Sequence, residues 1–134
     1  MTHKIMILPI LIVLITLVAC QRQEESAEQP QTQAAQLTTA QVKEAITTYV
    51  QDNTGAEGTF AIEDAVEGRI RQLTFGYVHD SVHETVDGRY YACVDFTEGP
   101  TDTLDLDFYV RGDPRGAPQL SKVVIHKVNG ESRF

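Results

Sequence analysis

The chain has 134 residues, 42% of them hydrophobic, and a formal net charge of −8, which suits one small globular domain. An acidic chain without a cluster of Lys and Arg repels phosphate backbones and anionic lipid headgroups. These properties argue against nucleic-acid binding and against electrostatic adhesion to a membrane. Any membrane attachment therefore has to be hydrophobic or covalent.

The first twenty residues have the anatomy of a signal peptide. Lys4 precedes an apolar run over residues 5–19, and Cys20 follows it directly. The run is shorter than the roughly 20 apolar residues that a membrane-spanning helix needs, and it contains Pro9. We expect this leader to be removed. The net charge then changes from −8 to −9, because Lys4 leaves with it.

The leader ends in Leu17-Val18-Ala19-Cys20. This motif resembles the lipobox of bacterial lipoproteins, in which small residues precede a cysteine that is alkylated with diacylglycerol, cleaved and then N-acylated. The resemblance implies a signal peptide over residues 1–19 and a membrane anchor at Cys20. Two or three acyl chains hold a protein lastingly, since each buried methylene contributes about 0.8 kcal/mol. The alternative is an ordinary secretory signal with an incidental cysteine.

Gln21 follows the cysteine. In lipoproteins of double-membraned bacteria an Asp at this place tends to retain the protein at the inner membrane. The resemblance therefore implies a bacterial cell-envelope protein at the outer membrane that faces the periplasm.

A polar segment separates this cysteine from the rest of the chain. Residues 21–36 are rich in Gln, Glu, Ala and Ser and contain no aromatic or large aliphatic residue, so they cannot bury a core. As a flexible coil, about sixteen residues span on the order of 20 to 25 Å. We expect residues 20–36 to form the lipid-bearing tether and residues 37–134 to form one small domain.

The domain begins with signals for a helix. Thr38 and Gln41 have capping-box spacing, and Leu37 and Val42 have the spacing of a hydrophobic staple. The sequence predicts that the helix ends at residues 53–55, Asn-Thr-Gly. Apolar residues at three- and four-residue steps form one stripe along it: Val42, Ala45, Ile46, Tyr49 and Val50.

After Gly58 the pattern is one of strands and turns. Glu67-Gly68 predicts a hairpin with a two-residue turn. In the register that this turn sets, apolar residues face apolar residues and Asp64 lies opposite Arg71.

A second two-residue turn is predicted at Asp87-Gly88. Alternating apolar residues over 104–110 continue the same face, and residues 120–128 supply a last strand after the Gly/Pro-rich stretch 112–118. The predicted fold class is α+β, with one N-terminal helix packed on a five-stranded antiparallel meander.

This layout resembles the cystatin-like and NTF2-like folds. Cystatin inhibitors carry a Gln-x-Val-x-Gly hairpin tip that enters cysteine proteases, and no such run occurs in this sequence. The sequence therefore argues against protease inhibition. NTF2-like enzymes use acid and base groups inside a deep cavity.

The second hairpin register would create a row of carboxylates. It pairs Asp80 with Asp95, a hairpin centred on Pro100 pairs Asp95 with Asp105, and Asp107 lies on the same face. Opposed like charges destabilise a sheet, so the row needs a cation, a nearby Lys or Arg, shifted pKa values or a bulge that breaks the register. A hard cation such as Ca²⁺ suits oxygen ligands. The alternative is a solvated acidic face.

His79, His83 and His126 are candidates for a transition-metal site. Strand parity places His79 and His83 on the apolar face. That position favours the other interpretation, histidines that are hydrogen-bonded at the rim of the core.

Cys93 is the only other cysteine, so acylation of Cys20 leaves it without a disulfide partner. The predicted register places Cys93 beside Asp107, whose charge raises the pKa of a thiol, and places no His next to it. Catalysis by this thiol is not expected. Tyr91 and Tyr109 are predicted to lie opposite one another, as cross-strand packing or as a docking patch.

The sequence holds no Ser-His-Asp elbow, phosphate loop, CxxC or paired zinc-ligand spacing. We therefore name no catalytic residue and expect no cofactor. The leading hypothesis is a non-enzymatic envelope lipoprotein that binds a protein, peptide or ligand through a sheet surface or edge. The alternative is an NTF2-like enzyme or small-molecule binder that uses His79, His83 and the acidic row. A third possibility is a structural spacer in the envelope.

Overall fold

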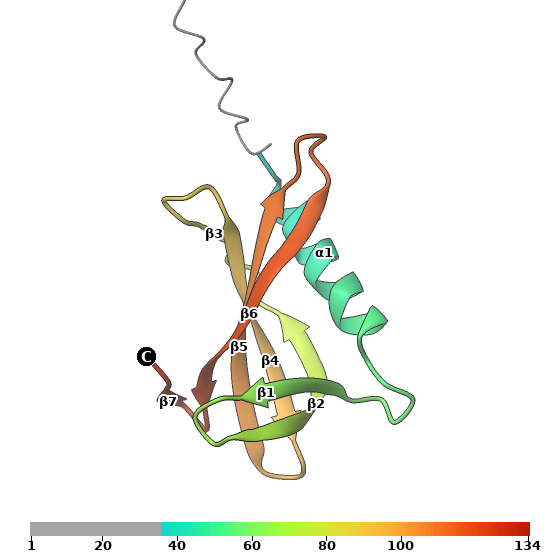
Figure 1. Ribbon diagram of the computed structural model, residues 1–134, viewed down its shortest axis with the longest axis vertical. Coiled ribbons are helices and arrows are strands. Elements are labelled where there is room, and N and C mark those ends of the chain that lie inside the picture. Colours follow the sequence, from blue (N-terminus) through green and yellow to red (C-terminus); the bar gives the residue numbers. More distant parts are fainter. Residues whose placement is uncertain (1–35) are drawn as a thin grey trace, which may run out of the picture. The chain divides into compact units, whose positions relative to one another are not determined.

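A computed structural model of the chain describes residues 36–134. The predicted leader, Cys20 and the predicted tether before residue 36 lie outside the described residues. The described part contains one helix and seven strands (Figure 1). These are α1 (Thr39–Asp52), β1 (Phe60–Asp64), β2 (Arg69–Val78), β3 (His83–Glu84), β4 (Tyr90–Glu98), β5 (Asp102–Gly112), β6 (Pro118–Val128) and β7 (Glu131–Ser132).

Helix α1 begins and ends where the sequence predicts. Thr38 is the N-cap: its hydroxyl accepts a hydrogen bond from the Gln41 backbone, and the Gln41 side chain accepts one from the Thr38 backbone. Asn53 is the C-cap. The apolar stripe is buried at Val42 and Ile46 and continues to the end of the helix. Local sequence is sufficient here because caps and stripe lie within one short segment.

The sheet is antiparallel and follows the order β1-β2-β4-β5-β6-β7, with β3 paired to the start of β4. The α+β class and the meander are confirmed, but the count of five strands is too low. Strands β3 and β7 have two residues each and pair with parts of β4 and β6. Two residues are too few to show an alternating pattern.

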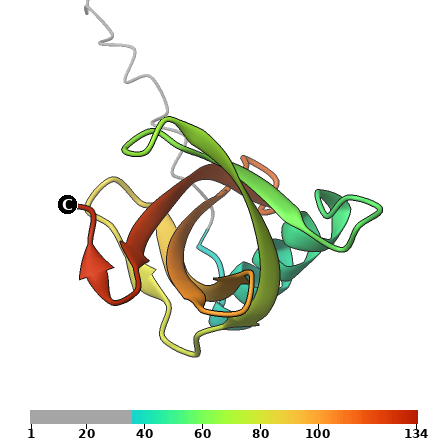
Figure 2. The same cartoon turned by 90° about the horizontal axis from the view of Figure 1, so that it is seen from below.

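The sheet curls into a half-barrel (Figure 2). Its inner face carries the core, and α1 covers part of that face. The curl brings the Phe60 ring of β1 to 5.6 Å from that of Phe96 and 6.1 Å from that of Phe108. The buried apolar residues of the inner face are Phe60, Leu73, Val78, Ala92, Val94, Phe96, Leu104, Leu106, Phe108 and Val110. The opposite side of β4, β5 and β6 is called the outer face below.

The first hairpin differs from the prediction by two residues. Asp64 pairs with Arg69, so that four residues, 65–68, form the loop. The Asp64 carboxylate accepts hydrogen bonds from the backbone of Val66 and Glu67, which ends the strand early. An Asp side chain that bonds the backbone just beyond it stabilises a turn. A shift of two keeps every side chain on its face, and the expected ion pair with Arg71 still forms.

Strand β2 contains a β-bulge between Phe75 and Val78. Gly76 and Tyr77 together oppose the single residue Asp95 of β4. A Cβ on Gly76 would lie 2.7 Å from the Asp95 carbonyl oxygen, so only glycine fits there without a shift. The bulge breaks the predicted register, and beyond it the two faces of the strand are exchanged.

Candidate functional site

The acidic row forms only in part. Asp95 pairs with Asp105 across β4 and β5, as predicted. The pairing of Asp80 with Asp95 was wrong, because residues 79–82 form a loop between β2 and β3, and Gly76 and Tyr77 oppose Asp95 instead. Asp80 lies in the loop after β2, and its carboxylate is 2.5 Å from Nζ of Lys43 on α1. That ion pair lowers the pKa of Asp80.

The carboxylates that remain in the row have neighbours of their own. Nε2 of His79 lies 2.7 Å from Oδ1 of Asp95, and Nζ of Lys127 lies 3.7 Å from Oδ2 of Asp105. A nearby Lys, one of the compensations that the sequence suggested for opposed carboxylates, is therefore present beside Asp105.

The expected position of two histidines was wrong. Both lie on the outer face, not at the rim of the core. The bulge at the end of β2 turns His79 outward, and β3 pairs His83 with Tyr91 of the outer face. The His79 ring stacks on Tyr77 and the His83 ring on Tyr91, each with centroids 5.0 Å apart.

Tyr91 and Tyr109 lie opposite each other, as predicted. Their rings stack with centroids 5.3 Å apart, and the guanidinium of Arg89 lies 5.2 Å from the centroid of Tyr109. Nζ of Lys122 lies 5.7 Å from the same centroid. These contacts agree with cross-strand packing that is reinforced by cations.

The third histidine joins Cys93 and Asp107 on the outer face. The Cys93 thiol donates to Oδ1 of Asp107 at 2.8 Å, and Nδ1 of His126 lies 3.5 Å from Oδ2 of Asp107 and 4.0 Å from Cys93 Sγ. Burial, the hydrogen bond to Asp107 and the carboxylate charge together raise the pKa of the Cys93 thiol to about 12. The thiol is therefore protonated at neutral pH.

The place of Cys93 beside Asp107 follows from the predicted register, but its nearness to His126 does not. A bulge in β6 leaves His126 as an extra residue between Ile125, opposite Leu106, and Lys127, opposite Asp105. The long turn before β6 gives no signal from which that bulge could be predicted. In the part of the chain that the structure describes, this trio is the one group of three such side chains placed to hold a metal ion.

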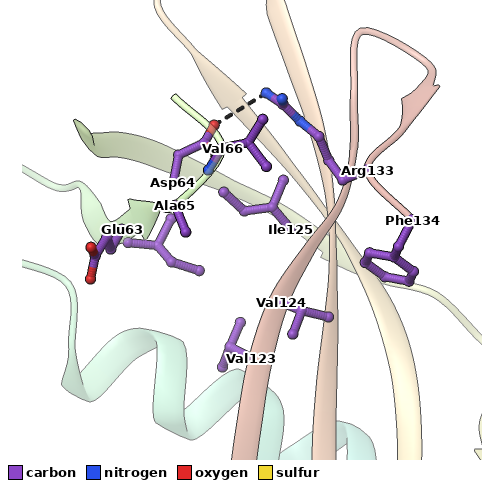
Figure 3. A pocket seen from close by; sticks show the side chains of 10 residues that line it. Glu63, Asp64, Ala65, Val66, Val123, Val124, Ile125, Arg133 and Phe134 are labelled. Carbon is purple, nitrogen blue, oxygen red and sulfur yellow. Dashed lines mark hydrogen bonds and ion pairs between the residues drawn. The ribbon is translucent and has the colours of Figure 1, made fainter. Parts of the chain in front are cut away.

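A groove lies between β1 with its following loop and β6, where the half-barrel stays open (Figure 3). Its volume is about 420 Å³. The side chains of Val66 and Ile125 face each other across it, and Val66 is 69% exposed. The lining residues are Ile62, Glu63, Asp64, Ala65, Val66, Val123, Val124, Ile125, Arg133 and Phe134.

Two open sheet edges border this groove. On its side away from β2, β1 makes only an isolated bridge at Phe60, and within the described residues Ala61–Asp64 have no further strand there. On its side away from β5, β6 pairs with β7 only at Lys127 and Val128. The backbone groups of Val123 and Val124 on that side therefore have no strand partner within residues 36–134. A second hollow, of about 540 Å³, lies between α1 and the start of β6 and has no such pair of edges.

One end of the groove is closed by a cluster of charged side chains, here named the ion cluster. Nη2 of Arg133, next to the C-terminus, lies 3.2 Å from Oδ2 of Asp64 and 2.8 Å from Oε1 of Glu67. The buried Arg71 guanidinium contacts Asp64, Glu67 and Glu98. Three carboxylates thus meet three guanidiniums, those of Arg71, Arg133 and the neighbouring Arg69. Sequence reasoning found only the Asp64–Arg71 pair, since Arg133 lies far along the chain.

These contacts shift the pKa values of the carboxylates. The hydrogen bonds from Arg69, followed by those from Arg71, lower the pKa of Glu98 to about 2 despite partial burial. Burial alone would raise the pKa of Asp64, but Arg71 and Arg133 lower it below its ordinary value. Arg133 itself is incompletely bonded, because its buried Nε has no acceptor among the described residues.

The fold and these sites define a small α+β domain with an open, apolar groove between two sheet edges and a separate Cys-Asp-His cluster. No family model, no curated protein sequence and no solved structure matches this chain. Within residues 36–134, no helix has the length and apolar character needed to cross a membrane.

Proposed function

We propose that this chain is a bacterial cell-envelope lipoprotein, anchored by lipid on Cys20, whose domain is a non-enzymatic binding module. The module takes up an extended segment of another polypeptide in the groove between β1 and β6. The observation that carries this proposal is the pair of open sheet edges that flank an apolar groove.

An extended segment suits the groove for two reasons. Open edges offer backbone donors and acceptors, and a segment that adds a strand satisfies them while its alternate side chains enter pockets. The exposed Val66 and the half-buried Ile125 offer apolar contacts for those side chains. A backbone carbonyl that reached Nε of Arg133 would also pair a donor whose lack of an acceptor costs about 1–3 kcal/mol.

The anchor is supported by the lipobox and by Gln21, which favour the outer membrane and a domain that faces the periplasm. The tether of residues 20–36 would hold the groove within reach of other envelope proteins.

The helix followed by a curled antiparallel sheet supports a cystatin-like or NTF2-like layout, and we propose that likeness at the level of layout alone. The alternative of an enzyme is less well supported. Of its acid and base groups, His79, His83 and the carboxylates of β4 and β5 lie on the outer face, and Asp80 is paired with Lys43 of α1. Helix α1 and the core fill much of the inner face.

Site-specific crosslinking tests the groove. A photoreactive amino acid replaces Val66 in the full chain, in the bacterial cells that produce it, and replaces Val86 in the control. Both positions carry an exposed valine at a loop between strands, but only Val66 lines the groove. We expect one discrete crosslinked protein from position 66 and none from position 86. Equal crosslinking from both positions, or none from position 66, contradicts the proposal.

A matched pair of substitutions then measures the contact. Val66→Asp places a charge in the groove and should weaken binding of the captured partner roughly tenfold or more, because an aliphatic side chain buried in an interface contributes about 1.5–3 kcal/mol. Val86→Asp should leave the affinity unchanged. Titration of the purified partner into each variant gives the two dissociation constants.

A further inference from the structure

We propose that Cys93, Asp107 and His126 bind a divalent transition-metal ion, with Zn²⁺ the best suited. The three residues lie on neighbouring strands, β4, β5 and β6, and present sulfur, oxygen and nitrogen to one point on the outer face. One ligand atom from each lies within 4.8 Å of the other two. None of the three ligand residues lines the groove, although Phe134 contacts both sites, and the metal site does not depend on the proposed function.

The donor set decides the class of metal. Zn²⁺ accepts thiolate, imidazole and carboxylate ligands, whereas Ca²⁺ and Mg²⁺ take oxygen ligands only. In a tetrahedral Zn²⁺ site, ligand atoms lie about 3.3 to 3.5 Å apart, given bond lengths of about 2.0 to 2.3 Å. The separations from His126 Nδ1, 3.5 Å to Asp107 and 4.0 Å to Cys93, are close to that value.

The short contact between Cys93 Sγ and Asp107, 2.8 Å, is bridged by the thiol proton. Metal binding replaces this proton: the S–H bond breaks, a metal–sulfur bond forms, and one proton passes to solvent. The ion then carries two positive charges against one thiolate and one carboxylate, with His126 neutral. The charges of the loaded site cancel.

Three further observations point to a built site. The β6 bulge makes His126 an extra residue of its strand, and bulges re-aim side chains beside functional sites. The Phe134 ring stacks on the imidazole with centroids 5.4 Å apart and so restricts its orientation.

Asp107 is also 96% buried, and a buried carboxylate is costly unless a cation or donors compensate it. The described residues supply three ligands at this point, so a fourth coordination position is open to water or another small ligand.

Co²⁺ and Zn²⁺ binding to the full chain in detergent tests the site. The chain carries Cys20→Ser, so that Cys93 supplies the only thiol, and no affinity tag is present. We expect Co²⁺ to produce thiolate-to-metal charge-transfer absorption, and one equivalent of Zn²⁺ to abolish it. Cys93→Ser should remove the absorption, and His126→Gln or Asp107→Asn should weaken Zn²⁺ binding at least about tenfold.

His83→Gln is the matched control, since His83 is an exposed histidine of the same face that stacks on Tyr91. It should bind Zn²⁺ as the parent chain does. The proposal is overturned if Co²⁺ gives no charge-transfer absorption, if Zn²⁺ binding survives Cys93→Ser, or if His83→Gln weakens binding as much as His126→Gln. Should a ligand variant fail to fold, the Co²⁺ spectrum of the parent chain decides.

Discussion

At the scale of single residues, Gly76 decides which side chains of β2 reach the outer face. It allows the bulge opposite Asp95, and the bulge sends His79 outward to that carboxylate. A glycine inside a strand pattern is a signal for a bulge or a close backbone approach. That signal is present in the sequence and indicates the outward position of His79.

Gly76→Ala should therefore destabilise the domain. The added Cβ meets the Asp95 carbonyl oxygen at 2.7 Å, and overpacking of this kind costs about 1–3 kcal/mol. Gly55→Ala is the control, because its Cβ would lie an ordinary 3.8 Å from the nearest atom, the Thr59 carbonyl oxygen. Urea unfolding of both variants gives the comparison, and equal stability of the two would contradict the role assigned to Gly76.

Asp64 is a second residue on which much depends, because it ends β1 and also pairs with the buried Arg71. Asp64→Asn leaves a buried guanidinium with one fewer anion. We expect the free energy of unfolding to fall by about 3–5 kcal/mol. The exposed Glu57→Gln should change it by less than about 0.5 kcal/mol. If Asp64→Asn lowers the free energy of unfolding by no more than Glu57→Gln does, the Asp64–Arg71 ion pair contributes little to stability.

At the scale of elements, the ion cluster ties the β1–β2 loop to the end of β4 and to the C-terminal residues after β7. Its carboxylates are Asp64, Glu67 and Glu98, and all three have pKa values below their ordinary ones. A depressed pKa in the folded state means that the stabilisation is complete above the unfolded-state pKa. It is lost as the pH falls through the folded-state pKa.

The melting temperature should therefore fall as the pH is lowered from about 4.5, the ordinary pKa of a Glu, to about 2, the pKa of Glu98 in the fold. Thermal unfolding followed by circular dichroism at a series of pH values measures this. Glu98→Gln should be less stable at neutral pH and should show a shallower decline in acid. A parent chain whose melting temperature is constant over this range would contradict the account.

Elements whose signals are local could be predicted, and those set by distant contacts could not. The capping box at Thr38 fixes the start of α1, and the turn at Pro100 fixes the β4–β5 register, including the Tyr91–Tyr109 stack. The first hairpin was misplaced because Asp64 bonds the loop backbone. The β6 bulge that brings His126 to Cys93 follows a long turn and shows no alternation that would reveal it.

At the scale of the whole molecule, the curl of the sheet creates the groove. It brings β1 and β6, strands about sixty residues apart in the chain, to opposite sides of one opening (Figure 2). Strand order can be predicted from turns, but the degree of curl depends on bulges and on the packing of Phe60 over Phe96. An exposed sheet edge could be expected from the sequence. That the curl brings the edge of β1 to face the edge of β6 could not.

Attachment to a membrane concerns the whole chain, and the account requires that the groove act at a membrane surface. The most direct measurement replaces the sulfur of Cys20 by oxygen in Cys20→Ser and compares where the two chains fractionate after cell lysis. The parent chain should pellet with membranes and be released only by detergent. The Cys20→Ser chain carries no acyl chains and should no longer need detergent to leave the membrane fraction. A Cys20→Ser chain that still fractionates and extracts as the parent does would contradict the lipid anchor.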